Sequence, residues 1–223
     1  MEFIERLKLE IEDIHDELFS VPFNRTISKI CDFGCGEGYT TLGLMLALKA
    51  TECIGIDKFS NDLLSPSLQN VEQAFKRLQD SILNTSSFKE GSLQQDLQRL
   101  FSESGFPVFQ KGDILKDDNF PDNLDFAYCK RVLGNIYTGE YNNFPSGEEG
   151  VSLAISNIEK TIRHGGFFCA IEKASADFAP IFERKGMKLL RVCRVQRGEI
   201  GSQGRHTSTT MIAQYFIYCY QKV

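Results

Sequence analysis

Several features that would define other classes of protein are missing from this 223-residue chain. Its uncharged apolar runs are all shorter than the roughly 18 residues that a membrane-spanning helix needs. Its first residues are acidic and periodic, unlike the basic flank and apolar block of a signal peptide. The three histidines (His15, His164 and His206) are isolated in sequence and have no visible catalytic partner. These absences argue against a membrane or secreted protein and against a histidine-based catalytic centre.

A disulfide framework is not expected either. The chain has seven cysteines, an odd number, and several lie inside apolar strand-like runs. Such cysteines are typical of small, buried hydrophobic side chains in a reducing compartment. We therefore expect a cytoplasmic protein.

The composition indicates one globular domain over residues 1–223. The 18 Phe and 7 Tyr supply ample surface to bury, which excludes a disordered chain. The formal charge of −5 is spread unevenly: residues 1–20 hold seven acids and two bases, and residues 183–223 hold eight bases and two acids. The two ends could face each other, or the basic end could meet an anionic substrate.

Hydrophobic periodicity predicts strands that alternate with helices. Strands are expected at residues 29–33, 52–57, 107–110, 124–129, 167–171, 189–195 and 211–220. Helices are expected at residues 1–20, 40–49, 65–82, 92–101, 146–163 and 180–185. The helix from residue 146 should stop at His164-Gly165-Gly166, a natural left-handed terminator.

This alternation predicts parallel pairing with right-handed crossovers, and an antiparallel hairpin for the last two strands. The expected fold is α/β: a doubly wound, mostly parallel seven-stranded sheet with an antiparallel last strand and an N-terminal helix. About 49 residues separate Asp57 from Pro107, more than one helical crossover needs. Residues 60–106 are therefore expected to hold a helical insertion that, with residues 1–20 and 137–147, covers a pocket.

The most informative segment is a glycine-rich loop between a strand and a helix. It reads Asp32-Phe33-Gly34-Cys35-Gly36-Glu37-Gly38. Glycines permit a tight turn and let a ligand lie against bare backbone, and the following helix offers unpaired N–H groups. A dinucleotide-binding loop would have its third glycine or alanine at position 39, where this chain has Tyr39.

Asp32 ends its strand two residues before the first glycine. A carboxylate at that position would repel a pyrophosphate, but it suits a ligand that presents a positive amino or sulfonium group. The loop therefore favours S-adenosylmethionine over NAD.

The order and spacing of these motifs resemble class I S-adenosylmethionine-dependent methyltransferases over about residues 29–220. The resemblance implies that the glycine loop surrounds the methionine part of the cofactor and that Asp57 holds both ribose hydroxyls. It also implies that Asp113 binds the adenine amino group, that Ile114 lies against the ring, and that Cys129-Lys130 lies near the methyl donor. The cofactor-binding residues so implied are Asp32, Gly34, Cys35, Gly36, Gly38, Asp57, Lys58, Asp113, Ile114 and Cys129.

Ordinary structural roles remain open for three of these charged residues. Asp57 could cap the turn into the next helix, Asp113 could be a turn former, and Lys130 could be a solvated charge. Metal-dependent catechol methyltransferases carry an acid at the end of the fourth strand and Asp-Asn at the end of the fifth. This chain has Cys129 and Glu172-Lys173 there, so no divalent metal is expected.

The resemblance predicts methyl transfer to a small-molecule acceptor by in-line displacement, in a pocket that excludes water. No catalytic base is evident, and Lys130, Tyr137, Tyr128 and Tyr141 are candidates by position only. The alternatives are an RNA or protein methyltransferase, a catalytically silent S-adenosylmethionine-binding protein and a nicotinamide-dependent oxidoreductase. A sequence pI near 5.3 disfavours nucleic acid, and no membrane partner is expected.

Overall fold

The computed structural model describes most of the chain. The described residues are 2–18, 21, 23, 25–58, 76, 79–80, 93–116, 119–140, 144–173, 177–199 and 211–223. The helix expected at residues 65–82 lies almost wholly outside them, and so does much of the expected 60–106 insertion. Within the described part, no helix combines the length and the apolar character that crossing a membrane would require.

Seven strands form one sheet in the order β3-β2-β1-β4-β5-β7-β6. Their bounds are β1 Lys29–Phe33, β2 Glu52–Asp57, β3 Val108–Lys111, β4 Leu124–Lys130, β5 Ile162–Lys173, β6 Met187–Glu199 and β7 Met211–Lys222. The first five strands pair in parallel, and β7 is antiparallel to both β5 and β6. The predicted doubly wound sheet with an antiparallel last strand is confirmed.

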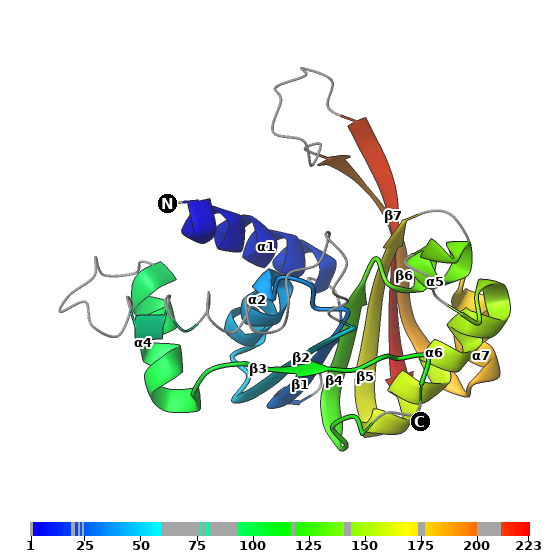
Figure 1. Cartoon of the computed structure of the whole chain (residues 1–223), viewed down its shortest axis with the longest axis horizontal. Coiled ribbons are helices and arrows are strands. Elements are labelled where there is room, and N and C mark those ends of the chain that lie inside the picture. Colours follow the sequence, from blue (N-terminus) through cyan, green and yellow to red (C-terminus); the bar gives the residue numbers. More distant parts are fainter. Residues whose placement is uncertain are drawn as a thin grey trace.

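Helices cover both faces of the sheet (Figure 1). Their bounds are α1 Glu2–Leu18, α2 Tyr39–Leu48, α4 Leu93–Ser104, α5 Leu133–Thr138, α6 Gly147–Thr161 and α7 Ala179–Arg184. The side chains of α5, α6 and α7 join one hydrophobic cluster, whereas α1 and α2 contribute to a second cluster on the opposite face. A third cluster joins α1, α2 and α4 beside β3.

The strands alternate their side chains between these two faces, as a period of two requires. In β4, Ala127 and Cys129 join the cluster of α5–α7, while Phe126 and Tyr128 join the cluster of α1 and α2. Because helices cover both faces of the sheet, the sequences of the central strands are mostly apolar, which made these strands easy to predict.

The helix α1 packs closely on α2 at one glycine. A Cβ added at Gly43 would lie 2.8 Å from Cδ1 of Ile14, so glycine is what permits this approach. The predicted N-terminal helix is thus confirmed, and it packs on its own domain.

The predicted end of the long helix is wrong by a few residues. The helix α6 ends at Thr161, and β5 already begins at Ile162, which pairs with Leu124 of β4. Gly165 does adopt a left-handed conformation, with φ of +71°, but it lies inside the strand at a shift in register. These glycines therefore form a bulge in β5, where the sheet pairing outweighs the helix-ending pattern.

Candidate functional site

The glycine loop lies at the carboxyl ends of the parallel strands, between β1 and α2. Gly34, Gly36 and Gly38 adopt φ values of +80°, +51° and +77°, a region that other residues rarely occupy. The N–H groups of Gly34 and Cys35 both donate to the carbonyl oxygen of Ile56 in β2, at 2.7 and 3.1 Å. The loop is therefore held against the end of the neighbouring strand.

Asp57, the last residue of β2, joins this loop directly. Its Oδ2 accepts a hydrogen bond from the N–H of Gly36 at 2.8 Å. No atom of the described residues lies within 4 Å of a Cβ added at Gly36, so among them a side chain there would meet open space. The structure thus brings together two parts of the site that the sequence predicted separately, with open space above the loop.

Asp32 lies below the loop and is only 1% exposed. The hydroxyl of Thr41 in α2 donates to its Oδ2 at 2.7 Å. Burial raises the pKa of Asp32 to about 7, although the Thr41 hydrogen bond opposes this shift. Because so little of its carboxylate is accessible, Asp32 would influence a ligand above the loop mainly through its charge.

Asp113 follows β3 and is engaged by two lysines. Its Oδ2 lies 3.3 Å from Nζ of Lys58 and 3.8 Å from Nζ of Lys116. Its Oδ1 accepts the N–H of Leu115 at 3.1 Å, which is an Asx-type turn. Asp113 thus forms a turn and also lies beside Lys58. An adenine amino group that bound to Asp113 would share its carboxylate with the ammonium group of Lys58.

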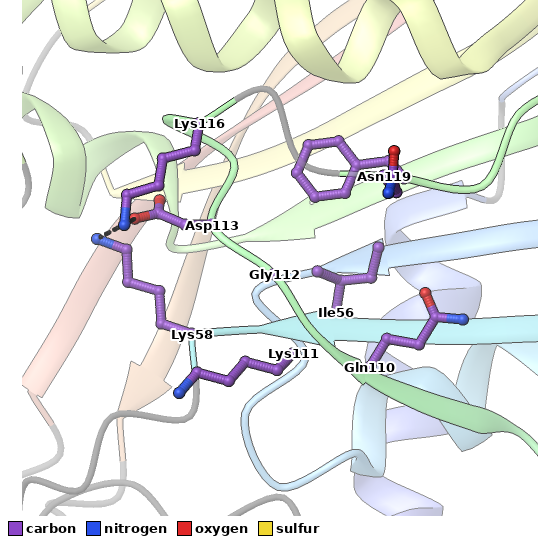
Figure 2. Close-up of a pocket in the computed structure, with 9 residues that line it drawn as sticks. Ile56, Lys58, Gln110, Lys111, Gly112, Asp113, Lys116 and Asn119 are labelled. Carbon is purple, nitrogen blue, oxygen red and sulfur yellow. Dashed lines mark ion pairs between the residues drawn. The ribbon is translucent and has the colours of Figure 1, made fainter.

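A cavity of about 530 Å³ opens beside Asp113 (Figure 2). Its lining residues come from the ends of β2 and β3 and from the loop after β3: Ile56, Lys58, Gln110, Lys111, Gly112, Asp113, Lys116, Asn119 and Phe120. The apolar residues among them are Ile56 and Phe120, whereas Ile114, expected against the adenine ring, is buried in the core. The structure therefore brings Lys58 and Asp113 to this cavity, whereas Ile114 is not among its lining residues.

Lys130, at the end of β4, pairs with acidic residues of α1. Its Nζ lies 2.6 Å from Glu10, 3.5 Å from Asp13 and 3.6 Å from the fully buried Glu17. Glu10 also accepts a hydrogen bond from the hydroxyl of Thr40 at the start of α2. The acidic residues at the start of the chain thus hold α1 against the carboxyl edge of the sheet.

This environment keeps Lys130 protonated. Burial lowers its pKa, but the carboxylates of Glu17, Glu10 and Asp13 more than offset this and raise the pKa above its ordinary value. A permanently charged ammonium cannot accept a proton, so the structure favours a structural role for Lys130 over that of a catalytic base.

The other candidates for a base differ in exposure. Tyr128 is fully buried and donates its hydroxyl to Glu17. Tyr137, in α5, is 40% exposed and packs edge-on against Phe178. Tyr141 lies outside the described residues. Cys129 and Cys35 are both buried, at 0% and 6% exposure.

Glu172, at the end of β5, has structural contacts that sequence reasoning missed. It is fully buried and accepts hydrogen bonds from the N–H groups of Val132, Leu133 and Gly134, at 3.0, 2.8 and 2.9 Å. Burial raises its pKa to about 7, while these three hydrogen bonds oppose the shift. The short helix α5 was not predicted, because its capping group comes from another strand rather than from a neighbouring residue.

The described residues contain no group of three or more His, Cys, Asp or Glu side chains that could hold a metal ion.

No family model matches the chain. A curated protein of Aspergillus luteorubrus, "Probable methyltransferase ltbC", is 24% identical over 163 residues, which are 73% of this chain and 46% of that protein. The chain thus spans about half the length of this relative.

Solved structures share the architecture at low identity. A S-adenosylmethionine-dependent methyltransferase of Methanosarcina mazei is 14% identical, with a TM-score of 0.58 over 95% of this chain and 97% of its own. Magnesium protoporphyrin IX methyltransferase of Synechocystis PCC 6803, solved with bound S-adenosylhomocysteine, is 16% identical, with a TM-score of 0.54 over 100% of this chain and 86% of its own.

The strand order, the glycine loop at the carboxyl edge and these likenesses agree with one another. The chain has the fold of class I S-adenosylmethionine-dependent methyltransferases.

Proposed function

We propose that the chain transfers a methyl group from S-adenosylmethionine to a small-molecule acceptor. The observation that carries the proposal is the 2.8 Å hydrogen bond from the N–H of Gly36 to Asp57. It joins the glycine loop to the acid that ends β2, at the carboxyl edge of the sheet where ligands of open α/β folds bind.

The residues at this edge fit the cofactor. The open space above Gly36 leaves bare backbone for the methionine part. Asp57 is half-buried and ends its strand beside that space, so its carboxylate is suited to accept the ribose hydroxyls. The cavity beside Asp113 offers the apolar side chains of Ile56 and Phe120 and one carboxylate, which suit an adenine ring with its amino group, although most of its other lining residues are polar or charged.

When bound, S-adenosylmethionine supplies a methyl group activated by a positive sulfonium. The chain's part is to align the acceptor with that carbon and to exclude water. The charge of Asp32, below the loop, favours a positively charged ligand above it. The ion pair between Lys130 and Glu10 ties α1 to the carboxyl end of β4, which supports a role for α1 in covering the site.

A small-molecule acceptor is supported by the net charge of −5, which disfavours a polyanionic RNA acceptor. One protein that shares the fold, the magnesium protoporphyrin IX methyltransferase, is named for a small-molecule acceptor.

Calorimetric titration with S-adenosylmethionine and S-adenosylhomocysteine tests the cofactor. Replacing Asp57 with alanine removes the ribose acceptor and the Gly36 contact, so affinity should fall about 100-fold, or about 3 kcal/mol. Asp57→Asn is the matched variant, because its amide oxygen can still accept from Gly36, and its loss should be smaller. Unchanged affinity in Asp57→Ala would refute the ribose assignment.

Turnover separates an enzyme from a silent binder. Incubation with labelled S-adenosylmethionine and a panel of small hydroxyl and amine acceptors should yield a labelled product and S-adenosylhomocysteine. Transfer to RNA alone would reject the acceptor class, and NADH fluorescence enhancement without S-adenosylmethionine binding would indicate an oxidoreductase instead.

A further inference from the structure

Glu172, at the end of β5, contacts the segment that follows β4. Its Oε1 accepts the N–H groups of Val132 and Leu133, and its Oε2 accepts that of Gly134. A buried carboxylate with three backbone donors is strongly held, since hydrogen bonds to a charged group are stronger than those between neutral groups. Glu172 therefore determines where the segment between β4 and α5 lies.

The bend of that segment requires such support. Arg131 adopts φ of +62°, a left-handed conformation that is unfavourable for a residue other than glycine. Its N–H donates to the carbonyl oxygen of Ile171 in β5 at 2.8 Å. Its guanidinium hydrogen-bonds to the hydroxyl of Tyr215 and lies 5.2 Å from the centre of that ring. The bend turns the next three N–H groups toward Glu172.

The same bend presses Val132 against the glycine loop. A Cβ added at Gly34 would overlap Cγ2 of Val132, so the two residues leave no space between them. On its other side, the loop donates from Gly34 and Cys35 to the carbonyl oxygen of Ile56. The loop is therefore held between the end of β2 and the side chain of Val132.

We propose that Glu172 is a positioning residue for the cofactor: it holds Val132 against Gly34 and so sets the position of the loop that receives S-adenosylmethionine. This inference rests on the proposed function, because it gives that same loop a second support. Glu172 itself is fully buried and acts through the backbone of residues 132–134, without touching the ligand.

The alternative is that Glu172 only caps the short helix α5. In that case its loss would lower stability and leave ligand affinity unchanged. A substitution of Val132, which lies between Glu172 and the loop, distinguishes the two roles. Val132→Ala removes the contact with the loop but leaves the Glu172 carboxylate and its three N–H donors in place.

The test measures the affinity for S-adenosylhomocysteine by calorimetry at pH 8, where the Glu172 carboxylate is ionised. We expect at least tenfold weaker binding for Glu172→Gln, whose amide group would face an N–H donor, and several-fold weaker binding for Val132→Ala. Val132→Thr keeps the shape of the side chain and should bind within about twofold of the wild type. The double variant Glu172→Gln/Val132→Ala should bind little worse than Glu172→Gln, since both changes act through one contact.

Asp125→Asn is the matched control. Asp125 is 5% exposed and accepts the N–H groups of Ser28 and Lys29 at 2.8 and 2.9 Å, but it lies at the amino ends of β1 and β4, the opposite edge of the sheet. Its replacement should lower the urea midpoint and leave the affinity for S-adenosylhomocysteine unchanged.

Wild-type affinity in folded Glu172→Gln, or additive losses in the double variant, would overturn the inference. If Glu172→Gln does not fold, Val132→Ala decides alone: several-fold weaker binding supports the inference, and unchanged affinity overturns it. A wild-type chain that binds neither S-adenosylmethionine nor S-adenosylhomocysteine would instead reject the proposed function.

Discussion

Replacing Asp32 with asparagine should stabilise the protein and weaken its hold on the cofactor. Asp32 is 1% exposed, and its Oδ2 accepts one side-chain hydrogen bond, from Thr41. Asparagine has nearly the same shape, and its amide oxygen can accept the same bond. The substitution therefore removes a buried negative charge and leaves the packing in place.

The size of the effect follows from the pKa of Asp32, which burial raises from 3.8 to about 7. The folded protein then binds a proton more tightly than the unfolded chain, so stability is lost as pH rises from about 4 to about 7. Ionisation of Asp32 lowers the free energy of unfolding by roughly 4 kcal/mol above pH 8. About 2 kcal/mol of this loss is already present at pH 5. The Asp32→Asn variant escapes this loss.

Urea unfolding of both proteins at pH 5, 6, 7 and 8 tests this reasoning. The advantage of Asp32→Asn in the free energy of unfolding should grow by roughly 2–3 kcal/mol between pH 5 and pH 8. Glu172 titrates over the same range in both proteins, so its contribution cancels in the difference. Curves that stay parallel, or a variant less stable at pH 8, would show that the buried charge is not the cause.

The Asp32→Asn variant should also change the affinities for S-adenosylmethionine and S-adenosylhomocysteine to different extents. S-adenosylmethionine carries a positive sulfonium, and S-adenosylhomocysteine has a neutral thioether in its place. The loss of a negative charge below the loop should therefore weaken the first ligand more than the second. Equal losses for the two ligands would exclude an electrostatic role for Asp32.

Three further predictions, one of them with a control substitution, concern other parts of the structure. Lys130→Met leaves the buried Glu17 without this cation and should lower the free energy of unfolding in urea by about 3–5 kcal/mol. A loss below about 1 kcal/mol would contradict the importance of these ion pairs. Gly36→Ala should cost about 1–2 kcal/mol and lower cofactor affinity at least tenfold. Gly105→Ala has similar strain and open space outside the site, so an equal loss of affinity there would refute the loop assignment. Phe182→Ala, at a fully buried ring, should cost about 3–5 kcal/mol, and a shift in thermal midpoint of under 2 °C would be inconsistent with its packing.

Local patterns in the sequence were sufficient for the seven strands, for most of the described helices and for the central motif. The strands at 29–33 and 52–57 occur with the predicted bounds, because strands buried on both faces are mostly apolar and these two end at an acid or just before a glycine. The glycine loop was equally readable, since its left-handed turns need glycine at fixed positions. Parallel strands bring their carboxyl ends to one edge, so the meeting of Asp57 with the loop was also implicit in the sequence.

Only the tertiary structure decided which side chains occupy that edge together. Lys130 meets Glu10 across 120 positions of sequence, and Glu172 meets Val132 across 40. Neither spacing carries a local signal, because each pairing depends on the order of strands in the sheet and on the helix that packs over them. The pKa values of Asp32 and Glu172 also depend on the tertiary structure. Both are raised because helices and loops from distant parts of the chain exclude water from the two carboxylates.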